Sequence, residues 1–295
     1  SFSCLAHMRA AQVVRYGRPV RRMITMTEKV IVSKDNPRIK TAKRLQERRE
    51  RLARRALLLE GVRLVADAWN AGVRPLTVFY DPDALRDGSP GAALLYAMTQ
   101  AGVEAWACTT IAFAELSETV TPQGLAAIVP LPELPLPGAP TLALVLDGVR
   151  DPGNAGTLLR SAEAVGVDMV LFGPGTVDAF NGKVVRAAMG AHMRLPLREL
   201  SSWEALRSLL PPDMALYVAE MEAALSYDAV PWQQRAALIV GGEAAGASAQ
   251  ARAEATAIRI PMRAPVESLN AAMAGTIVLF EAARQRKVNK DHRSL

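Results

Sequence analysis

Short apolar runs alternate with helical patterns along the first half of the chain. The runs are five or six residues long, and the segments between them carry apolar residues at helical spacing. Strands are expected at 56–61, 76–80, 103–108 and 125–129, and helices at 39–54, 62–71, 91–101 and 110–117. This alternation predicts a small α/β domain.

Residues 130–140, PLPELPLPGAP, hold five prolines in eleven positions. Proline at this density excludes helix and central strand and favours extended chain, so we expect a linker. A second α/β pattern follows, and its near-continuous apolar runs are typical of a parallel sheet buried on both faces. Its strands are expected at 142–147, 168–172, 214–219, 237–242 and 257–261, and its helices at 154–166, 183–190, 202–210 and 269–287.

Positive charge is concentrated near the N-terminal end. Residues 1–63 hold 17 Lys and Arg against 5 Asp and Glu, whereas residues 64–295 hold 18 against 24. A basic head of this kind is typical of a protein that binds a polyanion, and we favour nucleic acid over a merely solvated basic surface. The candidate phosphate contacts are Arg38, Lys40, Lys43, Arg44, Arg48, Arg49, Arg51, Arg54 and Arg55.

The first 25 residues hold five arginines, and no acidic residue precedes Glu28. This pattern fits an organellar transit peptide, a disordered basic arm, or upstream sequence ahead of a native start at Met26. We expect a mobile tail over 1–27 and a short C-terminal tail over 291–295.

The sequence lacks the patterns of a membrane-spanning helix, a disulfide framework, a metal site and several common catalytic motifs. No apolar run approaches the ~18 residues of a membrane-spanning helix. The two cysteines and three histidines lack the spacing of a disulfide framework or a metal site. The segments around Gly173, Lys183 and Ser248 fail the dinucleotide, P-loop and nucleophile-elbow patterns respectively. We therefore expect a cytoplasmic protein that uses no metal.

Three unusual segments, 146–167, 239–248 and 260–282, each lie at the carboxyl end of an expected strand. Ligands of open α/β sheets bind at such ends, where glycine lets the backbone approach closely, so three converging loops would form one pocket. Each polar residue also has an ordinary structural interpretation. Asn154 and Ser268 fit helix caps, Glu243 fits a surface acid, and Arg160 fits an ion-pair partner.

Taken in order, these segments resemble a known family. N-x-G-x-x-x-R-x-A at 154–162, G-G-E-x-x-G at 241–246 and I-P-M-x(4)-E-S-L-N at 260–270 resemble the three motifs of the SpoU/TrmH family of RNA ribose 2′-O-methyltransferases, in the SPOUT superfamily. The stretch 172–197 is similar too, although alanine stands at 188 where many members have serine, and AAMA replaces the frequent VSVA at 271–274. The N-terminal NPRIK…RL…LLLEGVRLV is similar to the substrate-binding domain of the ribosomal-RNA branch.

The resemblance implies S-adenosylmethionine-dependent 2′-O-methylation of a ribose in RNA. Ribosomal RNA of the 23S type is the substrate that it favours. It implies a C-terminal parallel-sheet domain over 141–290, threaded into a trefoil knot and forming a homodimer. An N-terminal α/β RNA-binding domain would occupy 28–129, joined through the linker at 130–140. Two alternatives stay open: a transfer-RNA ribose 2′-O-methyltransferase, and a non-catalytic RNA-binding or ribosome-assembly protein on the same fold.

The resemblance also implies site residues. Its catalytic positions fall on Arg160, Asn154, Glu243, Ser268 and Asn270, and its cofactor positions on Leu171, Phe172, Gly173, Gly241, Gly242, Gly246, Ile260, Met262, Ser268 and Leu269. A guanidinium stays protonated in proteins, so Arg160 fits a phosphate clamp better than a base. Aromatic residues make up only 5% of the chain, which favours recognition of RNA shape over base stacking.

Overall fold

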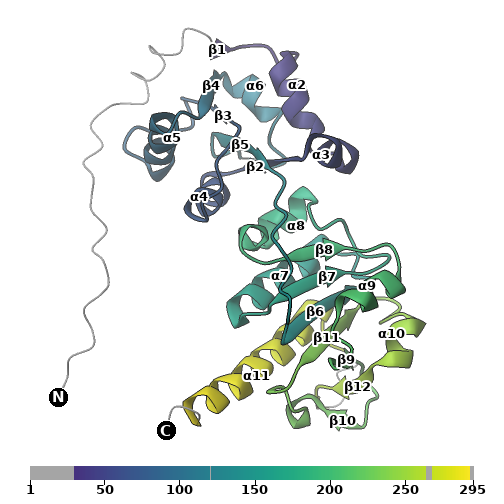
Figure 1. The fold of residues 1–295 in the computed structure, drawn as a ribbon. Coiled ribbons are helices and arrows are strands. Elements are labelled where there is room, and N and C mark those ends of the chain that lie inside the picture. Colours follow the sequence, from purple (N-terminus) through teal and green to yellow (C-terminus); the bar gives the residue numbers. More distant parts are fainter. Residues whose placement is uncertain (1–29, 120, 264–267, 293–295) are drawn as a thin grey trace, which may run out of the picture.

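The computed structural model describes residues 30–119, 121–263 and 268–292 of the chain. The tail expected at 1–27 and the last residues, 293–295, lie outside the described part. Figure 1 shows two β-sheets, one above the other, each covered by helices. The chain passes from the first sheet to the second through the proline-rich segment.

The N-terminal sheet has five strands in the order β1-β4-β3-β5-β2. Strand β4 pairs in parallel with β1 and β3, whereas β5 is antiparallel to both β3 and β2. The strands are β1 (Val30–Ile31), β2 (Ala56–Glu60), β3 (Thr77–Tyr80), β4 (Glu104–Cys108) and β5 (Leu125–Pro130). The last four coincide, to within one residue, with the four apolar runs of the sequence.

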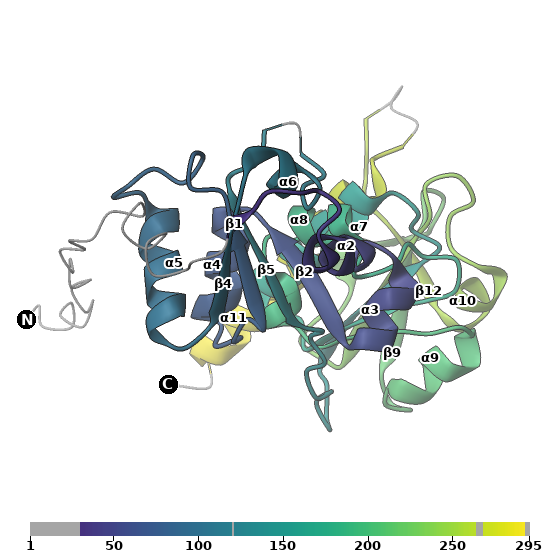
Figure 2. The same ribbon diagram turned by 90° about the horizontal axis from the view of Figure 1, so that it is seen from above.

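Helices cover both faces of this sheet. Alternate residues of its strands point to opposite sides, so each face carries apolar side chains that pack against helices. In β3, Val78 and Tyr80 pack against α4 (Val62–Asn70) and α5 (Pro90–Gln100), while Phe79 packs among residues of α2 (Pro37–Arg44) and α6 (Thr110–Ala114). Figure 2 shows α4 and α5 on one side of the sheet and α2 and α3 (Arg48–Arg54) on the other.

The single helix predicted over 39–54 is wrong, because the structure breaks it into α2 and α3 at Leu45–Glu47. The Leu45 side chain is buried in the core. The carbonyls that the break leaves free are satisfied by Arg51, whose Nη1 donates to the oxygens of Leu45 at 3.0 Å and Gln46 at 2.7 Å. Helix propensity is uniform across this segment, so only tertiary packing could place the break.

The C-terminal sheet has seven strands in the order β10-β12-β9-β11-β6-β7-β8, and every neighbouring pair in it is parallel, as predicted. The strands are β6 (Leu142–Asp147), β7 (Met169–Phe172), β8 (Leu197–Glu199), β9 (Ala215–Ala219), β10 (Leu225–Ser226), β11 (Ala236–Gly241) and β12 (Thr256–Arg259). The sequence did not predict β8 and β10, which are too short to give a pattern.

Strand β6 shows how the two faces of this sheet are built. Leu144 and Leu146 join the core beneath α7, α8 and α11, whereas Ala143 and Val145 join the core beneath α9 and α10. These helices are α7 (Pro152–Val165), α8 (Gly182–Ala187), α9 (Trp203–Leu209), α10 (Ala249–Glu254) and α11 (Ala271–His292), with 3₁₀ turns at Ala191–Met193 and Tyr227–Ala229. Within the described residues, no helix is long and apolar enough to cross a membrane.

The central strands bring two of the unusual segments to one edge of the sheet. Strands β6 and β11 pair in parallel over their whole length, with Asp147 opposite Gly241 at their carboxyl ends. The turn 148–151 and the loop 242–248 therefore leave the sheet side by side. The third segment follows β12 and leads into α11, which packs against α7 and β11.

Candidate active site

The turn after β6 orders the first turn of α7. Asp151 is the N-cap, and its Oδ1 accepts a hydrogen bond from the Asn154 backbone nitrogen at 2.7 Å. Pro152 occupies the first helical position, which proline favours because its φ already suits a helix. The prediction that Asn154 caps this helix is therefore wrong. With that role filled by Asp151, the Asn154 side chain is available for other contacts.

Asn154 joins the three unusual segments. Its Nδ2 donates to Glu243 Oε1 at 2.6 Å, and its Oδ1 accepts from Asn270 Nδ2 at 2.9 Å. An ionised carboxylate can only accept hydrogen bonds, so the amide nitrogen of Asn154 must face Glu243 and its oxygen must face Asn270. The orientation of both amides is thus set by one carboxylate.

Glu243 is held as an anion by its neighbours. Partial burial alone would raise its pKa, but hydrogen bonds from the Asn154 side chain and from backbone groups at Arg150 and Asp151 outweigh burial. The net pKa of Glu243 therefore lies below its ordinary value, and the carboxylate is charged at neutral pH. The Arg150 backbone nitrogen donates to Oε2 at 3.4 Å, which connects the loop 242–248 with the turn 148–151.

Asn270 is fixed at the start of α11. Its Oδ1 accepts from the backbone nitrogens of Ala272 at 2.9 Å and Met273 at 3.1 Å, which is N-cap geometry. The cap of the long helix is therefore Asn270 and not Ser268, to which the cap interpretation was given, and the helix begins at Ala271. The remaining donor of Asn270 is the Nδ2 group that reaches Asn154.

The glycines at the end of β11 and in the loop 242–248 are required by close backbone contacts. A Cβ on Gly241 would lie 2.2 Å from the Ala247 nitrogen, and one on Gly242 would lie 2.2 Å from the Gly148 oxygen. Gly242 and Gly246 also exchange backbone hydrogen bonds at 2.9 and 3.0 Å. No side chain larger than hydrogen fits between these segments, so the glycines determine how closely the loop packs on the turn.

Asp147 is a structural residue of the site that the sequence analysis missed. It is 3% exposed, and its Oδ2 accepts from the Ser248 nitrogen at 2.6 Å, which closes the glycine loop. Its signal was an acidic residue ending the otherwise apolar run LALVLD. A buried carboxylate needs hydrogen-bond partners, and this position at the strand end supplies one from the neighbouring loop.

A cavity of about 550 Å³ opens beside this network. Nine predicted site residues line it: Gly241, Gly242, Glu243, Gly246, Ile260, Met262, Ser268, Leu269 and Asn270. Val240 and Ile258 add apolar wall, while Glu220 and Arg252 add a charged pair whose Oε1 and Nε atoms lie 2.8 Å apart. The cavity thus combines apolar walls, backbone edges and a few polar groups, as small-molecule sites do.

Three residues predicted for the cofactor are not in this cavity. Leu171 and Phe172 are buried in β7, and Gly173 follows that strand, with its nitrogen donating to the Leu146 oxygen at 2.8 Å. The strand order explains this separation. Strand β6 lies between β7 and β11, so the end of β7 is one strand removed from the cavity.

Arg160 also lies away from the cavity of its own chain. It is six residues beyond Asn154 on α7, which is about 9 Å along a helix axis. Its side chain is exposed and makes no ion pair or hydrogen bond with the described residues. The structure therefore brings Asn154, Glu243, Ser268 and Asn270 together and leaves Arg160 on the surface.

The candidate phosphate contacts divide into two groups. Arg51 is 2% exposed and pairs with Asp178, so it is not available to a phosphate and that assignment is corrected. The others are exposed on α2 and α3 or next to them, although most have a protein partner: Arg38 stacks on Trp106, Lys40 pairs with Asp35, Lys43 with Glu115, Arg44 and Arg54 with Glu50, Arg48 with Glu199, and Arg55 with Glu133. Arg49 pairs with none of the described acids.

No group of three or more His, Cys, Asp or Glu side chains is placed to hold a metal ion in the part of the chain that the structure describes. The polar groups at the cavity are carboxylates, the Arg252 guanidinium, an amide, a hydroxyl and backbone groups. They suit hydrogen bonding to an organic ligand.

Comparison with known proteins connects both sheets to one family. Residues 141–280 match the SpoU rRNA Methylase family, and residues 36–127 match the MRM3-like substrate binding domain. The chain is 35% identical, over 258 residues, to the 23S rRNA (guanosine(2553)-2′-O)-methyltransferase RlmP of Bacillus subtilis (strain 168), covering 85% of this chain and 98% of that protein.

Two further similarities agree with this one. The mitochondrial rRNA methyltransferase 3 of Mus musculus is 33% identical over 79% of this chain and 68% of its own length. The crystal structure of an AdoMet-bound rRNA methyltransferase from Sinorhizobium meliloti superimposes with a TM-score of 0.75 at 28% identity, covering 87% of this chain and 97% of that one. The motif resemblance is confirmed, and the chain belongs to the SpoU rRNA methylase family.

Proposed function

We propose that this protein transfers a methyl group from S-adenosylmethionine to a ribose 2′-oxygen of ribosomal RNA. The observation that carries the proposal is the hydrogen-bonded chain Glu243–Asn154–Asn270, which lies at the cavity and joins all three family motifs. The relatives are named as ribosomal-RNA methyltransferases, and a substrate-binding domain match covers the basic N-terminal unit. A cytoplasmic location goes with that substrate and is part of the proposal.

The cavity fits S-adenosylmethionine. Its volume of about 550 Å³ is suitable for a nucleoside with an amino-acid tail, and the apolar side chains of Ile258, Ile260 and Leu269 can enclose an adenine ring. Gly241 and Gly242 leave backbone edges within reach of such a ligand. When bound, the cofactor would supply an electrophilic methyl group on a sulfonium.

The residues of the network would orient the ribose. Glu243 is charged and fixes Asn154, which in turn fixes Asn270. The exposed Ser268 hydroxyl lies at the same cavity and is suited to hydrogen-bond the ribose or its phosphate. Such a fixed array holds the attacking oxygen close to the methyl group and in line with it, which lowers the entropic part of the barrier.

Arg160 would bind the phosphate next to the target ribose. Its planar guanidinium can donate two parallel hydrogen bonds to a phosphate, and it stays protonated throughout. The position of Arg160 in its own chain favours action on a second copy. The helix that carries Arg160 packs against α11, to which Ser161 is hydrogen-bonded through Thr276 at 2.8 Å, and Met273 and Phe280 of α11 are 55% and 52% exposed.

That surface supports the homodimer that the resemblance implies. Met273 and Phe280 are seven residues apart and therefore share one face of α11. Two large exposed apolar side chains on one helix face are typical of an interaction surface. A dimer formed through α7 and α11 would carry the Arg160 of one protomer toward the cavity of its partner.

The trefoil knot is also part of the proposal. It would thread the segment after β12 behind the loop 242–248, and both segments line the same cavity. Resistance of cofactor binding to local unfolding would be its functional consequence.

The direct test is methylation of ribosomal RNA by the purified protein with labelled S-adenosylmethionine, followed by mapping of 2′-O-methyl groups. One modified ribose in the large-subunit RNA is the expected result. Label transfer confined to transfer RNA would replace the substrate assignment. Cofactor binding without any transfer to either RNA would favour a non-catalytic RNA-binding protein.

A further inference from the structure

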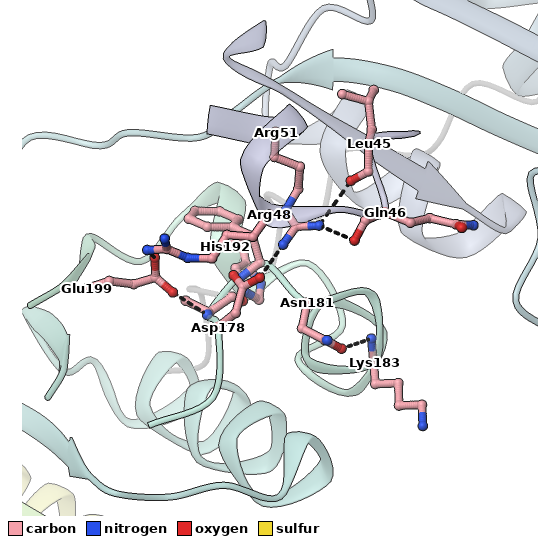
Figure 3. Close-up of polar contacts among 11 residues, drawn as sticks. Leu45, Gln46, Arg48, Arg51, Asp178, Asn181, Lys183, His192 and Glu199 are labelled. Atoms are coloured by element: carbon pink, nitrogen blue, oxygen red, sulfur yellow. Dashed lines mark hydrogen bonds and ion pairs between the residues drawn. The ribbon is translucent and has the colours of Figure 1, made fainter. Parts of the chain in front are cut away.

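The N-terminal unit is attached to the C-terminal sheet by a buried arginine. Arg51 of α3 is 2% exposed, and its guanidinium donates to three groups: the carbonyls of Leu45 and Gln46 and the carboxylate of Asp178 (Figure 3). Asp178 belongs to the segment that follows β7, so this contact crosses from the first sheet to the second. The two carbonyls are those released by the break between α2 and α3.

A second arginine of α3 reinforces the contact. Arg48 Nη2 donates to Glu199 Oε2 at 2.8 Å, and the other oxygen of Glu199 accepts from the Ala179 nitrogen at 2.7 Å. Asp178 is held similarly, because its Oδ1 accepts from the Phe180 nitrogen at 2.9 Å. Both acceptors are therefore fixed before the arginines reach them, which reduces the entropy lost on pairing.

The segment that holds Asp178 is itself bonded to the turn of the active site. Thr176 Oγ1 accepts from the Gly148 nitrogen at 2.9 Å and donates to the Leu146 oxygen at 2.8 Å. The Val177 nitrogen donates to the Val149 oxygen at 2.9 Å. The turn continues to Arg150, whose nitrogen meets Glu243. A continuous path of hydrogen bonds and adjoining backbone thus runs from Arg51 to the network of Glu243, Asn154 and Asn270.

We propose that Arg51 and Asp178 are positioning residues that hold the RNA-binding unit in a fixed orientation over the active-site turn. The inference rests on the proposed function, since it concerns how the bound RNA meets the site. Units joined by a linker move relative to each other by default unless an interface restrains them. A buried guanidinium that donates to three acceptors supplies a single well-defined geometry, which a surface pair of mobile side chains does not.

This role differs in a measurable way from phosphate binding, the role first expected for every arginine of this segment. An arginine that neutralises a phosphate contributes about 0.7–0.9 to the slope of log affinity against log salt. A positioning arginine contributes nothing to that slope but affects turnover, because a displacement of about 1 Å can cost ~100-fold in rate. The slope and kcat therefore separate the two roles.

The experiment compares Arg51→Met with Arg49→Met and with Arg235→Met, which removes an exposed ion pair with Asp213 inside the C-terminal unit. Cofactor affinity, RNA affinity across a salt series, kcat and KM on ribosomal RNA, and the radius of gyration from X-ray scattering are measured for each full-length variant. We expect R51M to lose about 10- to 100-fold in kcat, with an unchanged salt slope and cofactor affinity and a larger radius of gyration. R49M should lower the slope and raise KM, and R235M should match the wild type.

Asp178→Asn extends the test, because it removes the carboxylate charge while keeping an oxygen that can accept from Arg51. It should reproduce the kcat loss in milder form, and it replaces R51M if that variant does not fold. A reduced salt slope with normal kcat would make Arg51 a phosphate contact and overturn the proposal, as would wild-type behaviour of both variants. If the wild-type protein does not methylate ribosomal RNA, the proposed function fails, and the radius of gyration alone still decides whether the pair holds the units together.

Discussion

The Asn154 amide donates to the Glu243 carboxylate at 2.6 Å across 89 positions of sequence. The contact exists because β6 and β11 are adjacent parallel strands, so the segments that follow them meet at one edge of the sheet. Each residue alone is compatible with an ordinary cap or surface acid. Their pairing, and the link from Asn154 to Asn270, make these residues a unit.

Because they act as a unit, single changes in this network should not be additive. Asn154→Ala and Glu243→Gln are each expected to lower kcat by about 100-fold, the usual effect of losing one oriented hydrogen bond in a transition state. The double variant should be little worse than either one, giving a coupling of about 1–3 kcal/mol in a double-mutant cycle. Steady-state kinetics of the four proteins provide the measurement, and fully additive losses would show that the two residues act independently.

The same pair should be visible in the pH profile. The Asn154 hydrogen bond helps hold the pKa of Glu243 below its ordinary value, so the wild-type carboxylate stays charged well into the acid range. Removing the donor in N154A should raise that pKa and move the acid limb of the kcat profile to higher pH. An acid limb at the same pH in both proteins would mean that Glu243 does not control it.

Gly242→Ala tests the close packing of the glycine loop. The added methyl would lie 2.2 Å from the Gly148 oxygen, so the loop must move away from the turn and distort the cavity. Overpacking of this kind typically costs about 1–3 kcal/mol, and we expect at least a 10-fold loss of cofactor affinity by calorimetry. Gly138→Ala is the matched control, because a methyl group added there would meet no atom within 4 Å, and it should bind the cofactor normally.

The exposed cations of α3 should differ in what they contribute to RNA binding. Arg49 has no acidic partner among the described residues, whereas Arg54 shares Glu50 with Arg44. A phosphate must displace that carboxylate before it gains Arg54. Arg49→Gln should therefore lower the salt slope by nearly one unit, and Arg54→Gln by less. Filter binding over a salt series measures both slopes, and equal slopes would show that the Glu50 pair is irrelevant.

Whether Arg160 acts in the site of its own chain or in that of a second copy can be determined by combining two defective subunits in one dimer. In a heterodimer of Arg160→Ala and Glu243→Gln protomers, one site keeps its own Glu243 and meets the intact Arg160 of its partner. Action across the dimer therefore predicts that co-expression restores up to about half of the wild-type activity, well above the activity of either variant alone. Action within one chain predicts no recovery. Sequential purification on two different affinity tags, one on each variant, confirms that both protomers are present, and size-exclusion chromatography confirms the dimer.

The sequence predicted most of the regular structure because buried parallel strands leave an unmistakable apolar run. It could not place the break in the basic helix, since the cause is a guanidinium reaching back to two carbonyls from α3. The burial of Arg51 was hidden for the same reason. Arg48, Arg49 and Arg54 belong to the same basic segment, and the sequence alone does not distinguish Arg51 from them. Only the position of Asp178 in the folded protein does so.

The candidate site was predictable where one short motif supplies both the loop and its polar residue. Glu243 and Asn270 are of this kind, and the structure brings them to the cavity. The sequence could not show that Leu171 and Phe172 lie one strand away from this cavity, because the order of strands in a sheet is not encoded in the order of strands along the chain. Their role toward the cofactor stays a prediction. Arg160 remains a prediction, because its role depends on a second copy.

Protonation of His192 should make the stability of the protein depend on pH. Its ring is fully buried, with Nε2 hydrogen-bonded to the Ala179 oxygen at 2.7 Å and Phe180 packed against it. Burial lowers the pKa of His192 from 6.5 to about 4, despite the opposing effect of that hydrogen bond. The folded protein thus takes up the proton only near pH 4, whereas the unfolded chain takes it up near 6.5.

Between pH 6.5 and pH 4 the unfolded chain binds the proton more tightly than the folded protein does. The free energy of unfolding is therefore at its full value above pH 6.5 and falls as the pH drops toward 4. The shift corresponds to about 3 kcal/mol in the free energy of unfolding. His192→Gln keeps a donor for Ala179 but cannot titrate. The free energy of unfolding of wild type and H192Q is measured in urea at pH 7 and at pH 4. Relative to H192Q, the wild type should lose about that amount of stability between pH 7 and pH 4. A difference that stays constant between the two pH values would show that His192 is not the group being protonated.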